Sequence, residues 1–276
     1  MPELPEVETI VRDLAPRLEG RTLRAPRLFK SDVLRRVSRR RLLETIRRNR
    51  IEEVSRRAKH VVFLFKSGHR MVIQPRMTGS LLVYDRRLTA EERRYVVLQA
   101  GLAGGGTFAY RDVRRLGTVW LLDDAAWRSY TARIGPEPLA ADFDAAAFGA
   151  RLGGTRQAIK KVLMDQRRLA GVGNIYANEA LFRAGVDPSR PAHRLDPAAV
   201  RRLHHEVRAV LSEAIAAQGT TFRDYRTGTG ERGGYQFALH VYGRGGEPCH
   251  RCGTILQTTH TIDGRATTFC WRCQAG

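Results

Sequence analysis

A chain of 276 residues is long enough for two compact lobes, and its 48 lysines and arginines against 28 acidic residues give a formal charge of +20. This excess is larger than solubility requires, so it excludes a neutral or basic partner and indicates a polyanion. Only five of the basic residues are lysines, and arginine forks onto phosphates and stacks on bases. No apolar run has the length of a membrane span and the acidic start is unlike a signal peptide, so we expect a cytoplasmic protein associated with the bacterial nucleoid.

The first predicted element is an amphipathic helix over residues 5–18. Its apolar residues recur at helical spacing, Gly20 is a plausible stop, and Pro16 interrupts the last turn. The apolar positions are Val7, Ile10, Val11 and Leu14. Residues 31–57 are then dense in arginine, a composition typical of a solvated face.

Six short apolar runs follow, separated by glycines and charged residues. Their regular spacing predicts a β-sandwich or barrel that ends near a linker at Pro136-Glu-Pro138. The runs are 60–65, 71–74, 80–84, 95–98, 107–111 and 118–122. Together with the leading helix, they predict an N-terminal domain in which a helix packs with a sheet-rich core.

Beyond the linker the apolar spacing becomes helical. Helices are predicted from Asp142 or Asp144 to Leu152, over 156–165, from the glycine loop 171–174 to Ala184, and from the Asp196-Pro197 cap to Gly219. The short glycine loop between two helices indicates a helix-turn-helix-like arrangement. Residues 227–234 hold too many glycines and polar residues to pack a core, and we predict a mobile loop there.

The first residues of the chain can do covalent chemistry. If Met1 is removed, Pro2 carries a free secondary amine beside the carboxylate of Glu3. An α-amine titrates at about pH 8, so a useful fraction is neutral and nucleophilic at neutral pH. Its attack on an aldehyde-like carbon gives an iminium, which withdraws electrons without protonation. The alternative is that Pro2 and Pro5 merely lead into a helix whose first turn is acidic.

All four cysteines lie in the tail, as Cys249-His-Arg-Cys252 and Cys270-Trp-Arg-Cys273 with seventeen residues between the pairs. This spacing is typical of a zinc ribbon, and the alternative, two disulfides, is disfavoured in a cytoplasmic chain. Four thiolates close the metal site, which leaves His250 spare. We therefore predict one structural zinc that keeps a DNA-contacting hairpin in shape.

Several motifs in this order resemble bacterial formamidopyrimidine-DNA glycosylases over nearly the whole chain. They are Met1-Pro-Glu-Leu-Pro-Glu-Val-Glu-Thr9, Arg-Arg-Ala-Lys at 56–59, Met-Thr-Gly-Ser at 77–80, Asp-Val-Arg-Arg-Leu-Gly at 112–117, Gly-Val-Gly-Asn-Ile-Tyr-Ala-Asn-Glu at 171–179 and the four-cysteine tail. The resemblance implies a two-lobed α+β fold with three domains. These are a leading helix plus catalytic β-sandwich over 1–136, a helix-two-turns-helix lobe with a lesion loop over 137–234, and a zinc-finger hairpin over 235–276.

The resemblance implies a bifunctional glycosylase and abasic-site lyase that excises oxidised purines from double-stranded damaged DNA. It implies a monomer with no nucleotide cofactor and no membrane association. The endonuclease VIII branch, which takes oxidised pyrimidines, is an alternative, although Leu4 and the Val-Glu-Thr after Pro5-Glu6 favour the purine branch. A non-catalytic zinc-ribbon DNA-binding protein is a further alternative, but it would not require the Pro2-Glu3 start.

The resemblance also implies roles for individual residues. Pro2 would be the nucleophile, Glu3 the acid and base that opens the sugar, and Lys59 and Arg265 would hold the phosphates beside the lesion. Among DNA-binding residues, Met77, Arg114 and Leu116 would fill the hole left by an extruded nucleotide, and Lys160 and Asn174 would contact the backbone. Asn174 is otherwise expected as a helix N-cap. Glu6 and Glu179 would line the catalytic pocket.

Two loops depart from the family pattern. The chain has Gln74-Pro75-Arg76 where the family has His-Leu-Gly. It has Leu116 where the family has an aromatic wedge, a residue that stacks on the orphaned partner base. Val113 replaces a proline. Because leucine stacks on a base less well than an aromatic ring does, we expect weaker discrimination for cytosine opposite the lesion.

Overall fold

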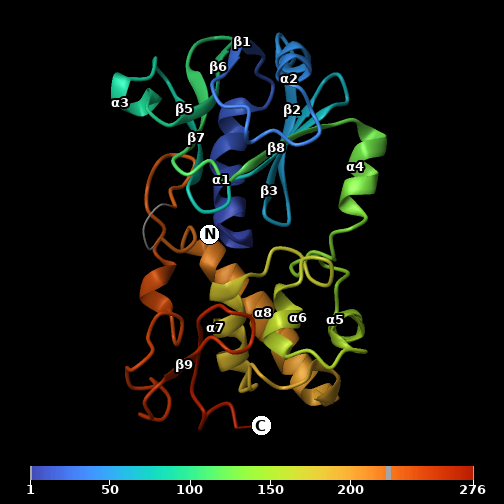
Figure 1. Cartoon of the computed structure of the whole chain (residues 1–276), viewed down its shortest axis with the longest axis vertical. Coiled ribbons are helices and arrows are strands. Elements are labelled where there is room, and N and C mark those ends of the chain that lie inside the picture. The colour runs from blue at the N-terminus through green and yellow to red at the C-terminus, as the bar shows by residue number, and fades with distance from the viewer. Residues whose placement is uncertain (1, 222–224, 276) are drawn as a thin grey trace. The chain divides into compact units, whose positions relative to one another are not determined.

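The computed structural model describes residues 2–221 and 225–275, which belong to two compact units (Figure 1). Unit 1 comprises Met1–Ala132 and Ala217–Gln236, and unit 2 comprises Arg133–Ala216 and Phe237–Gly276. The chain thus returns to unit 1 for one segment of about twenty residues before it completes unit 2. The division into three domains at residues 136 and 234 stays a prediction.

Unit 1 contains two four-stranded antiparallel sheets, and the six predicted apolar runs supply six of their eight strands. One sheet has the order β1-β6-β7-β5 and the other has the order β2-β3-β4-β8. The first comprises β1 (Leu23–Leu28), β5 (Gly79–Tyr84), β6 (Val96–Leu102) and β7 (Thr107–Asp112). The second comprises β2 (Ile51–Arg57), β3 (His60–Phe65), β4 (Arg70–Gln74) and β8 (Thr118–Leu122). Buried side chains of both sheets form one core, including the edge-to-face pair Phe63 and Phe108.

Helix α1 (Leu4–Leu18) packs into this core against β2, β3 and β5. Its predicted apolar stripe is buried, with Val7, Ile10 and Leu14 fully enclosed. Pro16 lies inside the last turn, yet the helix continues to Leu18. The main-chain N–H that a proline lacks is lost only at this end, so the helix stays regular over its first three turns.

The arginine-dense stretch contains a helix and a strand that were not predicted from its composition. Helix α2 (Arg39–Ile46) and strand β2 both fall within 31–57, and each buries only two apolar side chains. Strand β1 carries a bulge between Arg24 and Arg27, where Ala25 has a φ of 42°. The bulge breaks the alternation of buried and exposed residues, so no strand was predicted there. The short helix α3 (Ala90–Arg93) was also not predicted.

A second cluster covers the outer face of the β2-β3-β4-β8 sheet, where helix α4 (Asp124–Thr131) packs. His60 lies at its edge and is 8% exposed. Its Nδ1 is 3.1 Å from the carbonyl oxygen of Arg57, which only accepts, so Nδ1 donates and Nε2 accepts from the Tyr130 hydroxyl at 2.9 Å. Burial lowers the pKa of His60 to about 4, and it outweighs the Arg57 carbonyl, which raises it.

Unit 2 is mostly helical. It contains α5 (Ala145–Leu152), α6 (Ile159–Met164), α7 (Asn174–Ala184), η1 (Ala192–Arg194) and α8 (Pro197–Ala216), followed by β9 (Gln257–Thr259) and β10 (Thr267–Phe269). Asp144 caps α5, which decides between the two predicted caps, and Asp196 accepts from Ala199 N–H at 2.7 Å at the start of α8. Within the described ranges, no helix combines the length and apolarity that crossing a bilayer requires.

The lowered pKa of His60 predicts a pH-dependent loss of stability. The unfolded chain takes up a proton at the ordinary pKa of about 6.5, whereas folded His60 does so only at about 4, so acid favours unfolding between these values. Between about pH 7 and about pH 4.5, the native protein should lose about 2 to 3 kcal/mol more free energy of unfolding than His60→Gln. Urea unfolding followed by tryptophan fluorescence measures this, and equal losses in the two proteins would contradict it.

Candidate active site

The predicted nucleophile stands directly before α1. Pro2 is buried, and Glu3 is the N-cap residue of the helix. Glu3 and Glu6 form a reciprocal capping box, in which the N–H of Glu3 donates to Glu6 Oε2 at 2.7 Å. The partial positive charge at a helix N-terminus favours both carboxylates there. The fold therefore fixes the residue that follows Pro2 at both its main chain and its side chain.

Glu6 also connects α1 to the segment 217–236. Its Oε1 accepts from the N–H of Thr220 at 2.8 Å, and its carbonyl oxygen accepts from the Tyr225 hydroxyl at 3.2 Å. Gly219 has a φ of 81°, and a Cβ there would lie 3.0 Å from the Glu6 side chain, so this turn requires glycine. Glu6 was expected to line a pocket, and both of its carboxylate oxygens bind main-chain amides.

Lys59 is held in a two-residue turn between β2 and β3. Ala58 has a φ of 52°, and its carbonyl oxygen accepts from Arg56 Nη1 at 3.1 Å. Arg56 Nε in turn donates to Glu8 Oε2 of α1 at 2.8 Å. Burial raises the pKa of Glu8, but the hydrogen bonds from Arg56 and Arg12 outweigh it and the pKa is lowered. Lys59 itself is 5% exposed, and Arg56 ties the turn that carries it to α1.

Three exposed apolar side chains lie on two loops of unit 1: Met77 at 42%, Val113 at 54% and Leu116 at 44%. Hydrogen bonds join the two loops, because Thr78 Oγ1 donates to Asp112 Oδ1 and accepts from the N–H of Arg114. The exposed apolar tips are thus held together despite the departure at 74–76. Large exposed apolar groups on fixed loops are typical of a binding surface.

Asp112 connects the two loops through its carboxylate and is 2% exposed. Its Oδ2 accepts from Gly117 N–H at 2.8 Å and from the Tyr110 hydroxyl at 3.1 Å. A Cβ at Gly117 would lie 2.0 Å from the Tyr110 oxygen, so the Leu116 loop can close only with glycine there. Burial, followed by the neighbouring Asp112 carboxylate, raises the pKa of Tyr110, which therefore stays a hydroxyl donor.

In unit 2, the tip of the β9–β10 hairpin carries Arg265, which is exposed. Two predicted DNA-binding residues hold the neighbouring carbonyl oxygen of Ala266: Asn174 Nδ2 donates to it at 3.0 Å and Lys160 Nζ at 3.3 Å. Lys160 Nζ also donates to Thr267 Oγ1 at 2.7 Å and has no exposed surface. The structure thus differs from expectation, since Lys160 is buried under the hairpin and cannot present its charge to a phosphate in this conformation.

Two predicted site residues lie on α7. The N-cap of α7 is Gly173 and not Asn174, whose side chain reaches the hairpin instead. Glu179 was expected to line a pocket and is fully buried. Its carboxylate accepts three consecutive main-chain amides, from His240 at 2.8 Å, Val241 at 3.0 Å and Tyr242 at 2.8 Å. It fixes the chain that leads into the cysteine-rich tail.

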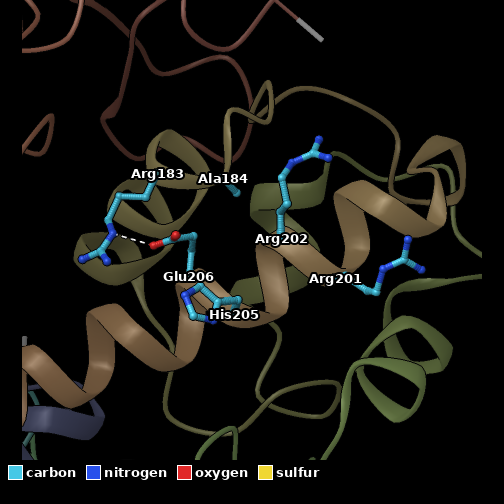
Figure 2. A pocket seen from close by; sticks show the side chains of 6 residues that line it. All are labelled: Arg183, Ala184, Arg201, Arg202, His205 and Glu206. Atoms are coloured by element: carbon cyan, nitrogen blue, oxygen red, sulfur yellow. Dashed lines mark hydrogen bonds and ion pairs between the residues drawn. The ribbon is translucent and has the colours of Figure 1, made fainter.

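None of the predicted site residues lines the hollow of about 290 Å³ over α7 and α8 in unit 2 (Figure 2). Its residues include Arg183, Arg201, Arg202 and Glu206. Arg183 is bound by two carboxylates, Glu206 and Glu213, each at 2.6 Å. The charge of Arg183 is therefore neutralised by the protein itself.

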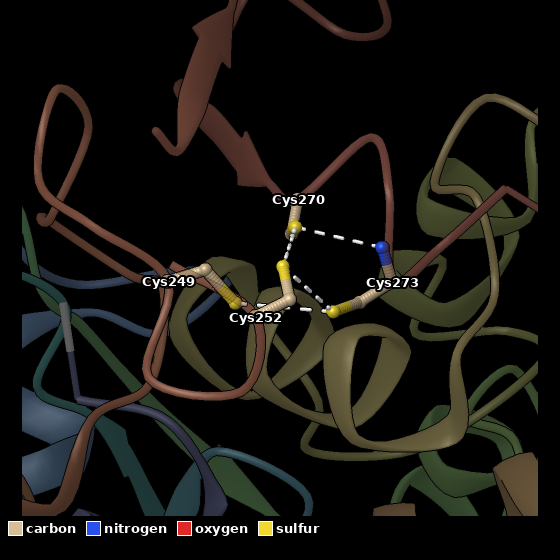
Figure 3. A group of neighbouring side chains, drawn as sticks. All are labelled: Cys249, Cys252, Cys270 and Cys273. Atoms are coloured by element: carbon tan, nitrogen blue, oxygen red, sulfur yellow. Dashed lines mark hydrogen bonds between the residues drawn. The ribbon is translucent and has the colours of Figure 1, made fainter. Parts of the chain in front are cut away.

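The four cysteine sulfurs converge, as Figure 3 shows, and all lie within 4.8 Å of one another. The Sγ atoms of Cys249 and Cys273 are 3.9 Å apart, and that of Cys252 is 3.5 Å from Cys270 and 3.4 Å from Cys273. A tetrahedron with Zn–S bonds of about 2.3 Å has edges of about 3.8 Å, so the set fits one zinc. Four protein ligands leave no open position, and the zinc is structural.

Side chains that position the site were not identified from the sequence. Thr78 and Asp112 lie within quoted motifs, but only the paired loops give them a role. Asn178 accepts from Thr268 N–H at 2.8 Å and donates to the carbonyl oxygen of Asn174, so it ties the hairpin to α7. The sequence did contain a signal that Lys160 is buried, because Lys160 shares a face of α6 with the apolar residues Ile159 and Leu163.

The closed site predicts one zinc per chain and four protected thiols. A thiol reagent should react with native protein only after a chelator removes the metal, because zinc binds the thiolates. Cys252→Ser should retain no tightly bound zinc and leave its three remaining thiols reactive without a chelator. Elemental analysis and thiol titration measure both effects, with zinc readdition to the native chain as the control. Reactive thiols in zinc-loaded native protein would contradict a closed four-cysteine site.

Family models match most of the chain. Residues 1–119 match the formamidopyrimidine-DNA glycosylase N-terminal domain, and residues 134–226 match the formamidopyrimidine-DNA glycosylase H2TH domain. Residues 246–276 match the zinc finger found in FPG and IleRS, in which the four cysteines lie. The matched domains follow one another in the order that the motifs predicted.

Individual relatives match over their full length. A formamidopyrimidine-DNA glycosylase of Chloroflexus aurantiacus is 41% identical over 274 residues, which covers 99% of this chain and 98% of the relative. A Lactococcus lactis FPG mutant in complex with Fapy-dG containing DNA has a TM-score of 0.91 at 32% identity, with 100% of both chains covered. The Lactococcus lactis Fpg in complex with abasic-site DNA has a TM-score of 0.90 at 32% identity, covering 99% of this chain and 100% of that one. With its motifs, domain order and whole length matched, the chain belongs to the formamidopyrimidine-DNA glycosylase family.

Proposed function

We propose that this protein is a bifunctional DNA glycosylase and abasic-site lyase that removes oxidised purines, 8-oxoguanine and formamidopyrimidines, from duplex DNA. The main support for this proposal is the Pro2-Glu3 start, which the Glu3–Glu6 capping box holds at the beginning of α1. The chain that carries it matches a relative of this family over 99% of its length. The solved relatives hold Fapy-dG and abasic-site DNA, which supports the same substrate class here.

The proposed reaction needs the Pro2 nitrogen free and neutral after removal of Met1. It attacks C1′ of an extruded nucleotide, the C1′–N bond breaks, and the base leaves with the bonding electrons and takes up the proton that the attacking nitrogen gives up. The lone pair of this nitrogen then expels the ring oxygen O4′, which Glu3 protonates. The product is an iminium, whose positive charge acidifies C2′. Loss of the C2′ proton expels the 3′ phosphate, a second elimination expels the 5′ phosphate, and water releases the sugar remnant from Pro2.

The remaining site residues bind and orient the DNA. Lys59 and Arg265 contact the phosphates on either side of the lesion, and both sit on turns that their neighbours fix. Met77, Arg114 and Leu116 enter the space that the extruded nucleotide vacates, which agrees with their exposure on joined loops. Asn174 contacts the backbone beside the hairpin. We assign Glu6, Lys160 and Glu179 as positioning residues, because each is buried and binds protein groups.

The zinc supplies shape and no chemistry, since its four cysteines close the site. We further propose that the protein acts as a monomer without a nucleotide cofactor. The formal charge of +20 supports association with the nucleoid between repair events, because non-specific DNA binding is dominated by phosphate contacts.

The covalent step predicts a trapped complex. Borohydride should reduce the iminium to a stable amine and crosslink the protein to DNA that carries 8-oxoguanine or an abasic site. Peptide mapping should place the crosslink at Pro2 and at none of the five lysines, which are mostly protonated at neutral pH. Trapped protein is measured by its shift in a denaturing gel.

The matched control is a chain with one residue added before Pro2, which turns the nucleophilic nitrogen into an amide. It should trap and cleave at background level while binding lesion DNA. The proposed role of Pro2 is falsified if the extended chain traps as well as the native one. Trapping only on oxidised pyrimidines would favour the endonuclease VIII-like alternative, and binding without any trapping would favour a non-catalytic DNA-binding protein.

The leucine wedge predicts a weak preference for the base opposite the lesion. Leu116→Phe adds an aromatic face against the orphaned base, and base–aromatic stacking is worth about 1 kcal/mol or more. Since adenine can stack as well, only part of this energy separates the two bases, and the ratio of kcat/KM for cytosine over adenine should rise by at most about fivefold. Single-turnover excision on the two duplexes measures this ratio. Val113→Phe is the control, because Val113 is also exposed, lies on the same loop and is not the wedge. A ratio unchanged in Leu116→Phe would remove Leu116 from opposite-base choice.

A further inference from the structure

Two adjoining hollows beside β1 carry charge that the proposed reaction does not use. The first, of about 590 Å³, is lined by Arg24, Arg47 and Arg48. The second, of about 650 Å³, is lined by Arg24, Arg27, Arg86, Arg87 and Arg93. They share Arg24 and Ala25, and we call the two together the arginine groove. Within the described part of the chain, seven arginines and no carboxylate line it.

The backbone of β1 is bent in a way that builds this groove. In a regular strand, Arg24 and Arg27 would point to opposite faces, because their spacing is odd. The bulge between them and the positive φ of Ala25 bring both to the exposed side, while Leu23, Pro26 and Leu28 stay buried. A strained non-glycine residue at a bulge is typical of a site where side chains are re-aimed for function.

The groove also has a low, fixed floor. Its lining includes the small residues Ala25, Ala103, Gly101 and Gly106. Arg21 holds this floor from below, since it donates to the carbonyl oxygens of Ala103 and Gly105. The seven arginines of the groove thus surround small residues whose main chain is tied to Arg21.

The positive charge of the groove is largely uncompensated. Among the residues that the structure describes, Arg86 is the one groove arginine that forms an ion pair, with Glu92 at 2.8 Å. Within the same described residues, Arg93 donates only to the carbonyl oxygen of Thr89, at 3.2 Å, and the other five form no ion pair. The hollow over α7 and α8 differs, because Glu206 and Glu213 hold its Arg183. A cluster of like charges costs stability unless a ligand neutralises it.

The groove lies at the far end of unit 1 from Pro2. Arg21, which holds its floor, follows α1 by three residues, and the 15 residues of α1 rise about 22 Å. Figure 1 shows β1, β6 and α2 at the end of α1 opposite to the N-terminus. A nucleotide held at Pro2 is thus about a whole helix length away from these arginines.

We propose that the arginine groove binds the phosphates of a second DNA segment while a first segment occupies the proposed active site. Arginine forks match phosphate oxygens, and two hollows in series suit successive phosphates of a backbone. An acidic peptide fits less well, because peptides dock through apolar anchors and the only large aliphatic residue lining the groove, Leu88, is 5% exposed. The site goes beyond the proposed repair reaction and lets the protein bridge DNA segments during its search.

Bridging can be measured without catalysis. Two lesion-free short duplexes, one with a donor and one with an acceptor dye, should show energy transfer when the native protein binds both. Arg24→Gln/Arg87→Gln should need about tenfold more duplex for the same transfer, and its log–log salt dependence should be flatter by about two units. Arg39→Gln/Arg41→Gln is the matched control, because it removes two exposed arginines of α2 that line neither hollow. The control should bridge like the native chain.

Each other outcome overturns the inference. No transfer with native protein would mean that no second segment binds, and equal loss in both variants would reduce the effect to net charge. Stronger displacement of the second duplex by polyglutamate than by unlabelled duplex would indicate an acidic protein partner. Slower excision from one short lesion duplex by Arg24→Gln/Arg87→Gln would assign the groove to the first segment. Borohydride trapping is scored separately, so a failure of the proposed reaction leaves the bridging result readable.

Discussion

Buried carboxylates that accept main-chain N–H groups hold the functional segments of this protein in place. Glu6 binds the amides of Glu3 and Thr220, Asp112 binds that of Gly117, and Glu179 binds three amides in a row. A buried carboxylate without donors is costly, so each of these segments must keep its conformation for the charge to be satisfied. These buried carboxylates therefore hold three segments in place: the Pro2 end, the Leu116 loop and the chain that leads to the zinc site.

The sequence predicted elements whose apolar spacing is regular. The α1 stripe, most of the strands and the capped α5 and α8 were predicted correctly, because one buried face is enough to reveal a helix or a strand. Strands β1 and β2 and helix α2 were missed, since arginines and a bulge interrupt their periods. A local sequence pattern does not show that contacts with distant segments stabilise these elements.

The candidate site shows the same limit in side chains. Motifs identified the zinc ligands and the loops around Met77 and Leu116, and the structure brings the cysteines together. Charge alone could not separate Arg265, which is exposed at a hairpin tip, from Lys160, which is buried beneath the same hairpin. The apolar neighbours of Lys160 on α6 indicate that it is buried. Its hydrogen-bond partners could not be predicted, because Ala266 and Thr267 lie more than a hundred residues away.

The excursion of residues 217–236 into unit 1 matters for synthesis on the ribosome. Glu6 and Asp13 of α1 bind Thr220 and Gly228, which are translated more than two hundred residues later. Unit 1 therefore cannot reach its final hydrogen-bonded state until most of unit 2 has emerged, although its two sheets are complete by residue 122. A nascent chain cut short before residue 217 would keep a folded sandwich whose head of α1, where Pro2 and Glu3 lie, lacks the contact that anchors it.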